Sequence, residues 1–321
     1  MKLKKVFIIS LLGGVILFFT NTDSYAQASV RYSVSTENQD EFSVKCTLSY
    51  IISVPGKTPW VRLTTLVPQS IPDIQKINNV EYSIRPARIF TRNGNRYAEI
   101  VINNPGRIEK LKMTISAELY RYDLQTAISN KEKNKLQKTG FEEFLKDENF
   151  IEKNNYEIRE IARSINGSSE VEIVRNIYNY VLDNMEYAIL GRKDRGALYA
   201  LKYKKGDCSE YTDLFAALCR AKRIPARVIS GIVVQSDRKT AKHSWAEVYL
   251  EKYGWVPFDP TRGDVRYTFL RNRSFSILEP RYIYFSNVRN DIVLRNYHFA
   301  FFVSVGDRIT MSDSIEFEFP D

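Results

Sequence analysis

A cysteine stands at the predicted start of a helix, where its thiol could act as a nucleophile. Cys208 follows Gly-Asp in the segment KKGDCSEYTDLFAALCRAKRIPAR. Asp207 is a favoured N-cap residue, and Glu210, three positions on, completes the pattern of a capping box. The free N–H groups and partial positive charge at a helix N-terminus favour a thiolate over a thiol. The same N–H groups could bind an oxyanion, so this position predicts a nucleophile.

The other two cysteines have different prospects. Cys219 lies in the apolar stripe of the same predicted helix, and Cys46 alternates with apolar residues in a predicted strand. We therefore expect both to be buried as small apolar side chains. Cys208 and Cys219 are separated by about 16 Å along a helix, which is too far for a disulfide.

A nucleophilic thiol also needs a base, and the chain has only two histidines. His298 lies in the aromatic segment NYHFAFF and is expected to pack in a strand. In KHSWAEVYL, strand alternation puts His243 on the face opposite Ala246 and Val248, free to face a site. Asp259 ends the next predicted strand, GWVPFDPT, and antiparallel pairing would bring it beside His243. Carboxylate, imidazole and thiol together suggest a catalytic triad.

Two regions of different pattern surround these residues. Residues 27–125 show alternation, β-branched residues and turn signals, which predict an antiparallel β-sandwich. Residues 126–140 are polar and charged and predict a linker. Helical periods and then strands follow, so residues 141–321 are predicted to form one domain that includes the last strands of the chain. The expected fold class is α+β, with the sandwich preceding an α+β core.

The first 26 residues are typical of a cleaved export signal. Lysines at positions 2, 4 and 5 precede a mostly apolar run over residues 6–19, and Ser-Tyr-Ala at 24–26 offers a cleavage site. The run is shorter than the roughly 20 residues that span a membrane as a helix. We therefore expect a periplasmic or secreted protein without a transmembrane segment in the mature chain.

The charge balance indicates an ordinary basic surface. The formal net charge is +9, but no block of five or more like charges occurs, and Lys and Arg are interspersed with Asp and Glu. We therefore expect no nucleic-acid partner. The chain also lacks a CxxC pair, so no zinc site is predicted, and no cofactor is expected.

Three segments in register resemble the transglutaminase-like superfamily. They are GDC opening a helix that leads to IPAR, then HSWAEVYL, then GWVPFDPT, and the resemblance spans about residues 195–262. It implies a papain-like core with the cysteine on a helix and the histidine and aspartate on adjacent strands. By position, Cys208 would be the nucleophile, His243 the general base and acid, and Asp259 the residue that orients His243. The sandwich resembles, more weakly, the one that precedes this core in many exported bacterial members.

The resemblance also implies supporting roles. Asp207 would cap the helix, Arg227 would hold a carboxylate or carbonyl, and Trp245 and Trp255 would pack around the triad.

One departure from the family concerns the oxyanion. Animal transglutaminases place a Trp upstream of the cysteine, whereas the three Trp here lie at positions 60, 245 and 255. Tyr199 or Tyr203 could take its place, although no spacing argument selects either.

These features predict an exported thiol enzyme that acts on protein amide bonds through a thioester. Hydrolysis, as a cysteine peptidase or amidase, is favoured because the expected Trp is missing and water is the most abundant acceptor. The alternatives are a protein-glutamine gamma-glutamyltransferase, which crosslinks, and a non-catalytic binding module with the same fold. The expected partner is a protein or peptide substrate in the cell envelope. The sequence does not predict the oligomeric state.

Overall fold

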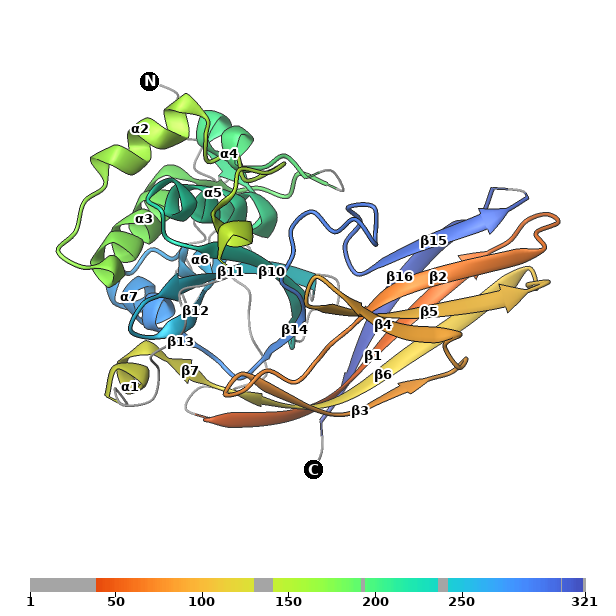
Figure 1. The fold of residues 1–321 in the computed structure, drawn as a ribbon. Helices are drawn as coiled ribbons and strands as arrows, with labels where there is room; N and C mark the ends of the chain where they lie inside the picture. Colours follow the sequence, from red (N-terminus) through yellow and green to blue (C-terminus); the bar gives the residue numbers. More distant parts are fainter. Residues whose placement is uncertain (1–38, 130–140, 192–193, 236–241, 307, 320–321) are drawn as a thin grey trace, which may run out of the picture.

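The fold has two lobes, a helix-rich lobe and an elongated β lobe (Figure 1). The computed structural model describes residues 39–129, 141–191, 194–235, 242–306 and 308–319. The expected signal segment, residues 1–26, and most of the expected linker lie outside the described residues.

Two four-stranded antiparallel sheets form the β lobe, as the alternation in the sequence predicts. The first has the order β16-β1-β6-β3, with β1 (Glu41–Ser53), β3 (Gln75–Tyr82), β6 (Ile108–Tyr120) and β16 (Thr310–Glu318). The second has the order β15-β2-β5-β4, with β2 (Trp60–Val67), β4 (Arg88–Arg92), β5 (Asn95–Asn103) and β15 (Ala300–Val305). Alternate residues such as Val44, Cys46 and Leu48 fill the core between the sheets.

The last two strands belong to this sandwich, so the prediction that they extend the C-terminal domain is wrong. In the antiparallel register, β16 places Ile315 opposite Leu48 of β1, and β15 places Phe302 opposite Leu63 of β2. Alternation identifies a segment as a strand but does not specify which sheet it joins. Here the apolar side chains of the tail, such as Ile315 and Ile309, are buried in the sandwich core.

The helix-rich lobe packs helices against a third four-stranded antiparallel sheet, of order β12-β11-β10-β14. Its main elements are α2 (Tyr156–Ser164), α3 (Glu170–Asn184), α4 (Ala197–Tyr203), α5 (Cys208–Ala221), β10 (Ala226–Val233), β11 (Lys242–Leu250), β12 (Gly254–Phe258) and β14 (Tyr282–Ser286). The shorter ones are β7 (Tyr122–Asp123), α1 (Leu124–Ser129), η1 (Glu142–Leu145), β8 (Glu186–Tyr187), β9 (Lys205–Gly206), α6 (Pro260–Gly263), α7 (Thr268–Ser276) and β13 (Ile277–Leu278). Within the described ranges, none of the helices is both long and apolar enough to cross a membrane.

Helix α5 is the centre of this lobe. Residues 210–220 are all buried, so the helix is covered on every side. Phe215 and Leu218 share a core with Ala246 and Val248 of β11, which are the apolar face that alternation predicts for that strand. The helix that begins at Cys208 is therefore held rigidly against the sheet.

A loop of residues 287–299 joins the two lobes. Arg289 donates from Nε and Nη2 to both carboxylate oxygens of Asp213 on α5, at 2.8 and 2.9 Å. Burial disfavours the guanidinium charge, but the Asp213 carboxylate outweighs burial and holds the pKa of Arg289 above its usual value. Two residues further on, Asp291 accepts a hydrogen bond of 2.7 Å from the Tyr97 hydroxyl of β5. The loop is thus bonded to both lobes.

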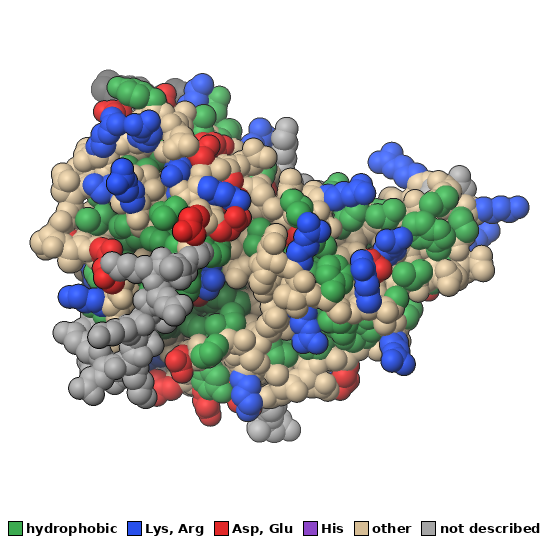
Figure 2. Space-filling model, in the orientation of Figure 1, with side chains coloured by type: hydrophobic (Ala, Val, Ile, Leu, Met, Phe, Trp, Pro, Cys, Tyr) green, Lys and Arg blue, Asp and Glu red, His purple; other side chains and the backbone are tan. Residues whose placement is uncertain are grey.

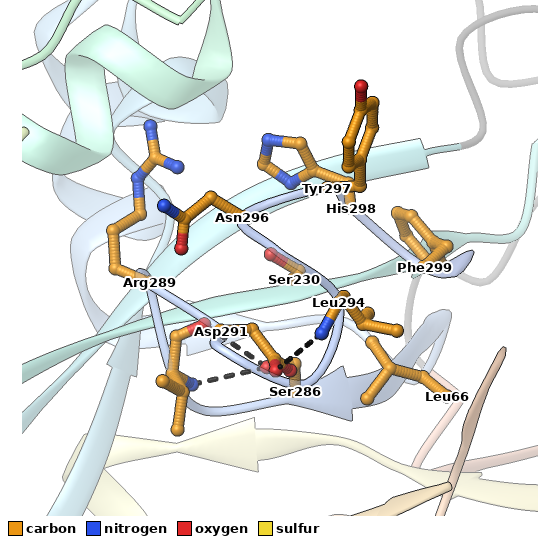
Figure 3. A pocket seen from close by; sticks show the side chains of 11 residues that line it. Leu66, Ser230, Ser286, Arg289, Asp291, Leu294, Asn296, Tyr297, His298 and Phe299 are labelled. Atoms are coloured by element: carbon orange, nitrogen blue, oxygen red, sulfur yellow. Dashed lines mark hydrogen bonds between the residues drawn. The ribbon is translucent and has the colours of Figure 1, made fainter. Parts of the chain in front are cut away.

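The same loop lines a small cavity of about 10 Å³, room for about one water molecule (Figure 3). The prediction that His298 packs in a strand is wrong, because this residue lies in the loop and is exposed. Its Nε2 lies 2.9 Å from Oδ2 of Asp194, which also accepts from Arg289 at 2.9 Å. The aromatic residues that flank His298 in the sequence therefore did not indicate that its side chain is buried.

Charged side chains are scattered over the surface. On the face seen in Figure 2, Lys and Arg lie over both lobes with Asp and Glu among them.

We expect Arg289→Met to destabilise the protein strongly. The substitution leaves the Asp213 carboxylate buried without its partner, and breaking a buried ion pair in this way costs about 3–5 kcal/mol. Denaturant unfolding followed by circular dichroism measures the change in the free energy of unfolding. Arg163→Met is the control, because Arg163 pairs with Glu160 on the surface and its loss should leave stability nearly unchanged. Equal effects of the two substitutions would contradict the role given to Arg289.

Candidate active site

Cys208 is the first residue of α5, and the capping box predicted around it is present. The Asp207 side chain accepts the Ser209 N–H at 3.0 Å, and the Glu210 carboxylate accepts the Asp207 N–H at 3.1 Å. The Cys208 side chain is half-buried, whereas Cys46 and Cys219 are fully buried, as predicted. Cys208 is therefore the one thiol of the three that is open to a reagent.

The Gly-Asp-Cys sequence follows from how tightly Glu210 packs below the cysteine. Glu210 is only 1% exposed, and its second oxygen accepts the Arg195 N–H at 2.9 Å. A Cβ at Gly206 would overlap the Glu210 side chain, so only glycine fits there. Burial, and then the nearby Asp207 charge, raises the pKa of Glu210 to about 7. The turn before Cys208 is fixed by these contacts.

The structure brings Cys208, His243 and Asp259 together. Strands β11 and β12 pair in antiparallel register with Ala246 opposite Phe258, so Asp259 emerges beside His243. His243 Nε2 lies 2.7 Å from Asp259 Oδ2. Cys208 is close enough to the same ring for its side chain to act on the pKa of His243. The order thiol, imidazole, carboxylate is the one that the sequence predicts.

The electrostatics of the three groups favour an ion pair. Burial alone would lower the pKa of His243, but Asp259 and Cys208 outweigh it and hold that pKa well above its ordinary value. Burial would likewise raise the pKa of Asp259, yet its contacts with His243 hold it below its usual range. The geometry thus stabilises an imidazolium beside a carboxylate.

Asp259 is itself held from several elements. It is 2% exposed, and besides His243 its Oδ2 accepts the Tyr282 hydroxyl of β14 at 2.8 Å. Its Oδ1 accepts the Arg262 N–H of α6 at 3.0 Å, and its backbone carbonyl accepts the Tyr178 hydroxyl of α3 at 3.0 Å. Sequence reasoning missed Tyr282, since nothing in the pattern YIYFS marks one tyrosine as a partner of Asp259.

Trp245 packs against the triad as predicted, but Trp255 does not. The Trp245 ring is fully buried and lies 6.1 Å from the His243 ring at an angle of 24°. Trp255 lies at the other end of β12 from Asp259, with the guanidinium of Arg227 4.1 Å from its ring.

Arg227 holds a carboxylate, as expected. Its Nε donates to Glu247 at 2.6 Å, and Glu247 is buried on β11. This ion pair ties β10 to β11 next to the strand positions that carry the site.

Neither tyrosine proposed to replace the upstream Trp is singled out by its contacts. Tyr199 and Tyr203 stack on each other, with ring centroids 4.6 Å apart. A different residue, Tyr187 of β8, shares the environment of Cys208: burial, and then the charges of Cys208 and its neighbours, raise the pKa of Tyr187 to about 12. It sits opposite Gly206 of β9, two positions before Cys208. That placement depends on a parallel pairing that the sequence does not reveal.

The described part of the chain contains no group of three or more His, Cys, Asp or Glu side chains arranged to hold a metal ion.

Comparison with known proteins identifies the family. Residues 159–260 match the transglutaminase-like superfamily, and these residues include Cys208, His243 and Asp259. This segment is therefore a transglutaminase-like core, which confirms the family that the three sequence segments indicate.

One solved structure shares the fold over most of this chain. A candidate cysteine protease from Cytophaga hutchinsonii superposes with a TM-score of 0.61 at 17% identity, over 88% of this chain and 91% of that one. At this identity the likeness establishes a shared fold, and the α+β class is confirmed.

Sequence relatives are matched over short stretches. The uncharacterised protein YebA of Bacillus subtilis is 30% identical over 78 residues, which is 20% of this chain and 11% of that protein. An uncharacterised protein of Haemophilus influenzae is 32% identical over 108 residues, 26% of this chain and 29% of its own. This chain thus spans well under half the length of either relative.

We expect Cys208 to be alkylated selectively. Burial raises the pKa of Cys46 to about 12 and that of Cys219 further, so both stay protonated and shielded at neutral pH. Iodoacetamide should modify Cys208 at least about 100-fold faster than either. Peptide mass spectrometry after timed quenching measures the three rates. In denaturant the rates should converge, and equal rates in the folded protein would contradict the site.

Proposed function

We propose that this protein is an exported thiol enzyme that hydrolyses amide bonds of proteins or peptides through a thioester on Cys208. The observation that supports this most is the 2.7 Å contact between His243 Nε2 and Asp259 Oδ2, with Cys208 near enough to the same imidazole to affect its pKa. A thiol, a base and an orienting carboxylate in this order are the parts that nucleophilic acyl transfer needs.

In the first half of the proposed reaction, His243 holds the proton of the Cys208 thiol, and the thiolate attacks the amide carbonyl carbon. A C–S bond forms, and an electron pair moves onto the carbonyl oxygen. Asp207 already accepts the N–H groups of Ser209 and Glu210 in the first turn of α5, so the N–H of Cys208 itself is the proposed donor to this oxyanion. When the tetrahedral adduct collapses, the C–N bond breaks, and the leaving amine takes the proton from His243.

In the second half, the thioester is opened by water. His243, now neutral, takes a proton from the water as its oxygen attacks the thioester carbon. The C–S bond then breaks, and His243 returns the proton to the sulfur. Asp259 keeps the ring oriented throughout, because its Oδ2 stays bonded to Nε2 while the other ring nitrogen exchanges the proton.

Crosslinking is the second candidate, because a lysine amine could replace water at the thioester. The half-exposed Tyr187 near Cys208 supports crosslinking as a candidate. Its aromatic hydroxyl could assist the oxyanion in place of the missing Trp. A non-catalytic binding module is the third, although it would not need the His243–Asp259 ion pair.

Export to the cell envelope is part of the proposal. It rests on the basic, apolar and small-residue pattern of residues 1–26. Protein or peptide substrates of the envelope would then be the partners.

The test compares wild type with Cys208→Ala on a glutamine-rich protein in the presence of a fluorescent primary amine. Mass spectrometry detects new peptide ends, deamidated glutamine or incorporated amine. Cleavage or deamidation by wild type alone supports hydrolysis, and amine incorporation supports transfer. If neither occurs and Cys208 is alkylated no faster than Cys219, the protein is a binding module.

We expect Asp259→Asn to lower kcat/KM by about 10²–10⁴ and to shift its pH profile. The Asp259 charge raises the pKa of His243, so its removal lets the imidazolium lose its proton at lower pH. The alkaline limb of kcat/KM should therefore move to lower pH. Steady-state kinetics across pH measure both effects. Asp264→Asn, which removes a carboxylate bonded to Tyr211 instead, should leave the limb in place.

A further inference from the structure

One side chain of the sandwich is bonded to the backbone of a strand in the other lobe. Gln75 lies on β3 and is 1% exposed. Its Oε1 accepts the Tyr284 N–H at 2.8 Å, and its Nε2 donates to the Tyr284 carbonyl at 3.1 Å. The same Nε2 donates to the Gln69 carbonyl at 2.7 Å. The amide thus binds both polar groups of one residue of β14, as a neighbouring strand would.

The strand that Gln75 holds is an edge strand. β14 pairs with β10 on one side only, in the order β12-β11-β10-β14. That pairing shifts register between Ser230 and Gly231, opposite the middle of β14. A Cβ at Gly231 would overlap both the Ile283 carbonyl and the Trp245 ring, so β14 approaches closely here. An irregular ladder with one free edge positions a strand less firmly than two regular neighbours.

Two residues before Tyr284, β14 supplies a donor to the proposed triad. The Tyr282 hydroxyl donates to Asp259 Oδ2 at 2.8 Å, the oxygen that also bonds His243 at 2.7 Å. The two tyrosines are on the same face of the strand, and both rings pack against Trp245. A shift of β14 would therefore move the Tyr282 hydroxyl relative to Asp259.

We propose that the sandwich completes the active site: Gln75 fixes β14 so that the Tyr282 hydroxyl stays on Asp259, and both are positioning residues for His243. The inference rests on the proposed function, because it assigns both residues to the triad. Asp259 is fully buried and cannot use water as a donor, so each protein donor determines how its carboxylate lies. A change in β3, in the other lobe, is thereby transmitted to the imidazole.

The histidine signals in an NMR titration test this inference without a substrate. The chain has two histidines, so a His298→Gln variant assigns both resonances. The titratable side chains that act on or lie near His243 include Asp259, Cys208 and Tyr282, whose ring is 6.3 Å away, and the Trp245 ring packs 6.1 Å away. In Tyr282→Phe the Asp259 charge at Oδ2 is balanced by the imidazolium alone, so the pKa of His243 should rise, by about 0.5 or more. If Tyr282→Phe only loosened the packing, water would enter and weaken the interaction between Asp259 and the imidazolium, so the pKa of His243 would fall.

A double-mutant cycle then tests the link to the sandwich. Gln75→Met keeps the volume but removes both hydrogen bonds to Tyr284 and the one to the Gln69 carbonyl. The Tyr282 hydroxyl should then leave Asp259 part of the time, and the His243 pKa should rise as in Tyr282→Phe. In the Tyr282→Phe background, Gln75→Met should add nothing, because the hydroxyl it positions is gone. Gln69→Ala and Tyr284→Phe are matched controls that should leave the titration unchanged.

The inference is wrong if Gln75→Met leaves the pKa of His243 unchanged. It is also wrong if Gln75→Met shifts that pKa equally with and without the Tyr282 hydroxyl. If Gln75→Met does not fold, Gln75→Asn replaces it in the same cycle, since it keeps the amide but shortens its reach. If the wild-type protein neither cleaves, deamidates nor crosslinks its substrates, the proposed function is refuted. The titration would still decide whether Gln75 positions His243.

Discussion

The arrangement of this site depends on one buried negative charge. A carboxylate that is 2% exposed is tolerated only when hydrogen-bond donors replace the water it has lost. For Asp259 these donors are the His243 ring, the Tyr282 hydroxyl and the Arg262 N–H, which come from three different elements. The sheet, α6 and β14 must therefore all be in place before the imidazole has a fixed direction. Cys208 belongs to a fourth element, α5, and its side chain affects the pKa of the same ring.

A buried charge on α5 explains why the loop between the two lobes is held firmly. Asp213 lies inside this helix, which is buried on every side, and its carboxylate needs a partner. Arg289 supplies that partner from the loop after β14, and Asp291 of the same loop is bonded to Tyr97 of the sandwich. The chain then ends in two strands of the sandwich. The tail thus closes the structure from β14 back to β1 and β2.

Local patterns predicted how the candidate site residues are placed, because capping and alternation act over a few residues. The N-cap before Cys208 and the strand face of His243 were predicted in this way, and the family was predicted from the resemblance of three segments. What the sequence could not predict were contacts set by packing between distant segments. The Tyr282–Asp259 bond joins residues 23 apart, and the Gln75–Tyr284 bond joins residues 209 apart. The sheet joined by the last strands, the parallel pairing that places Tyr187 and the exposure of His298 have the same origin.

The residues that hold Asp259 from a distance lie outside the segment that matches the family. The family match covers residues 159–260 and so contains the thiol, imidazole and carboxylate but neither Gln75 nor Tyr282. The fold shared with the Cytophaga hutchinsonii protein covers 88% of this chain. If a core could orient its own carboxylate, the sandwich would be free to vary in position. The outer edge of β14 is held by a side chain from the sandwich, which restricts that freedom. If Gln75 acts as proposed, the physical unit that positions the imidazole is the pair of lobes and not the core segment alone.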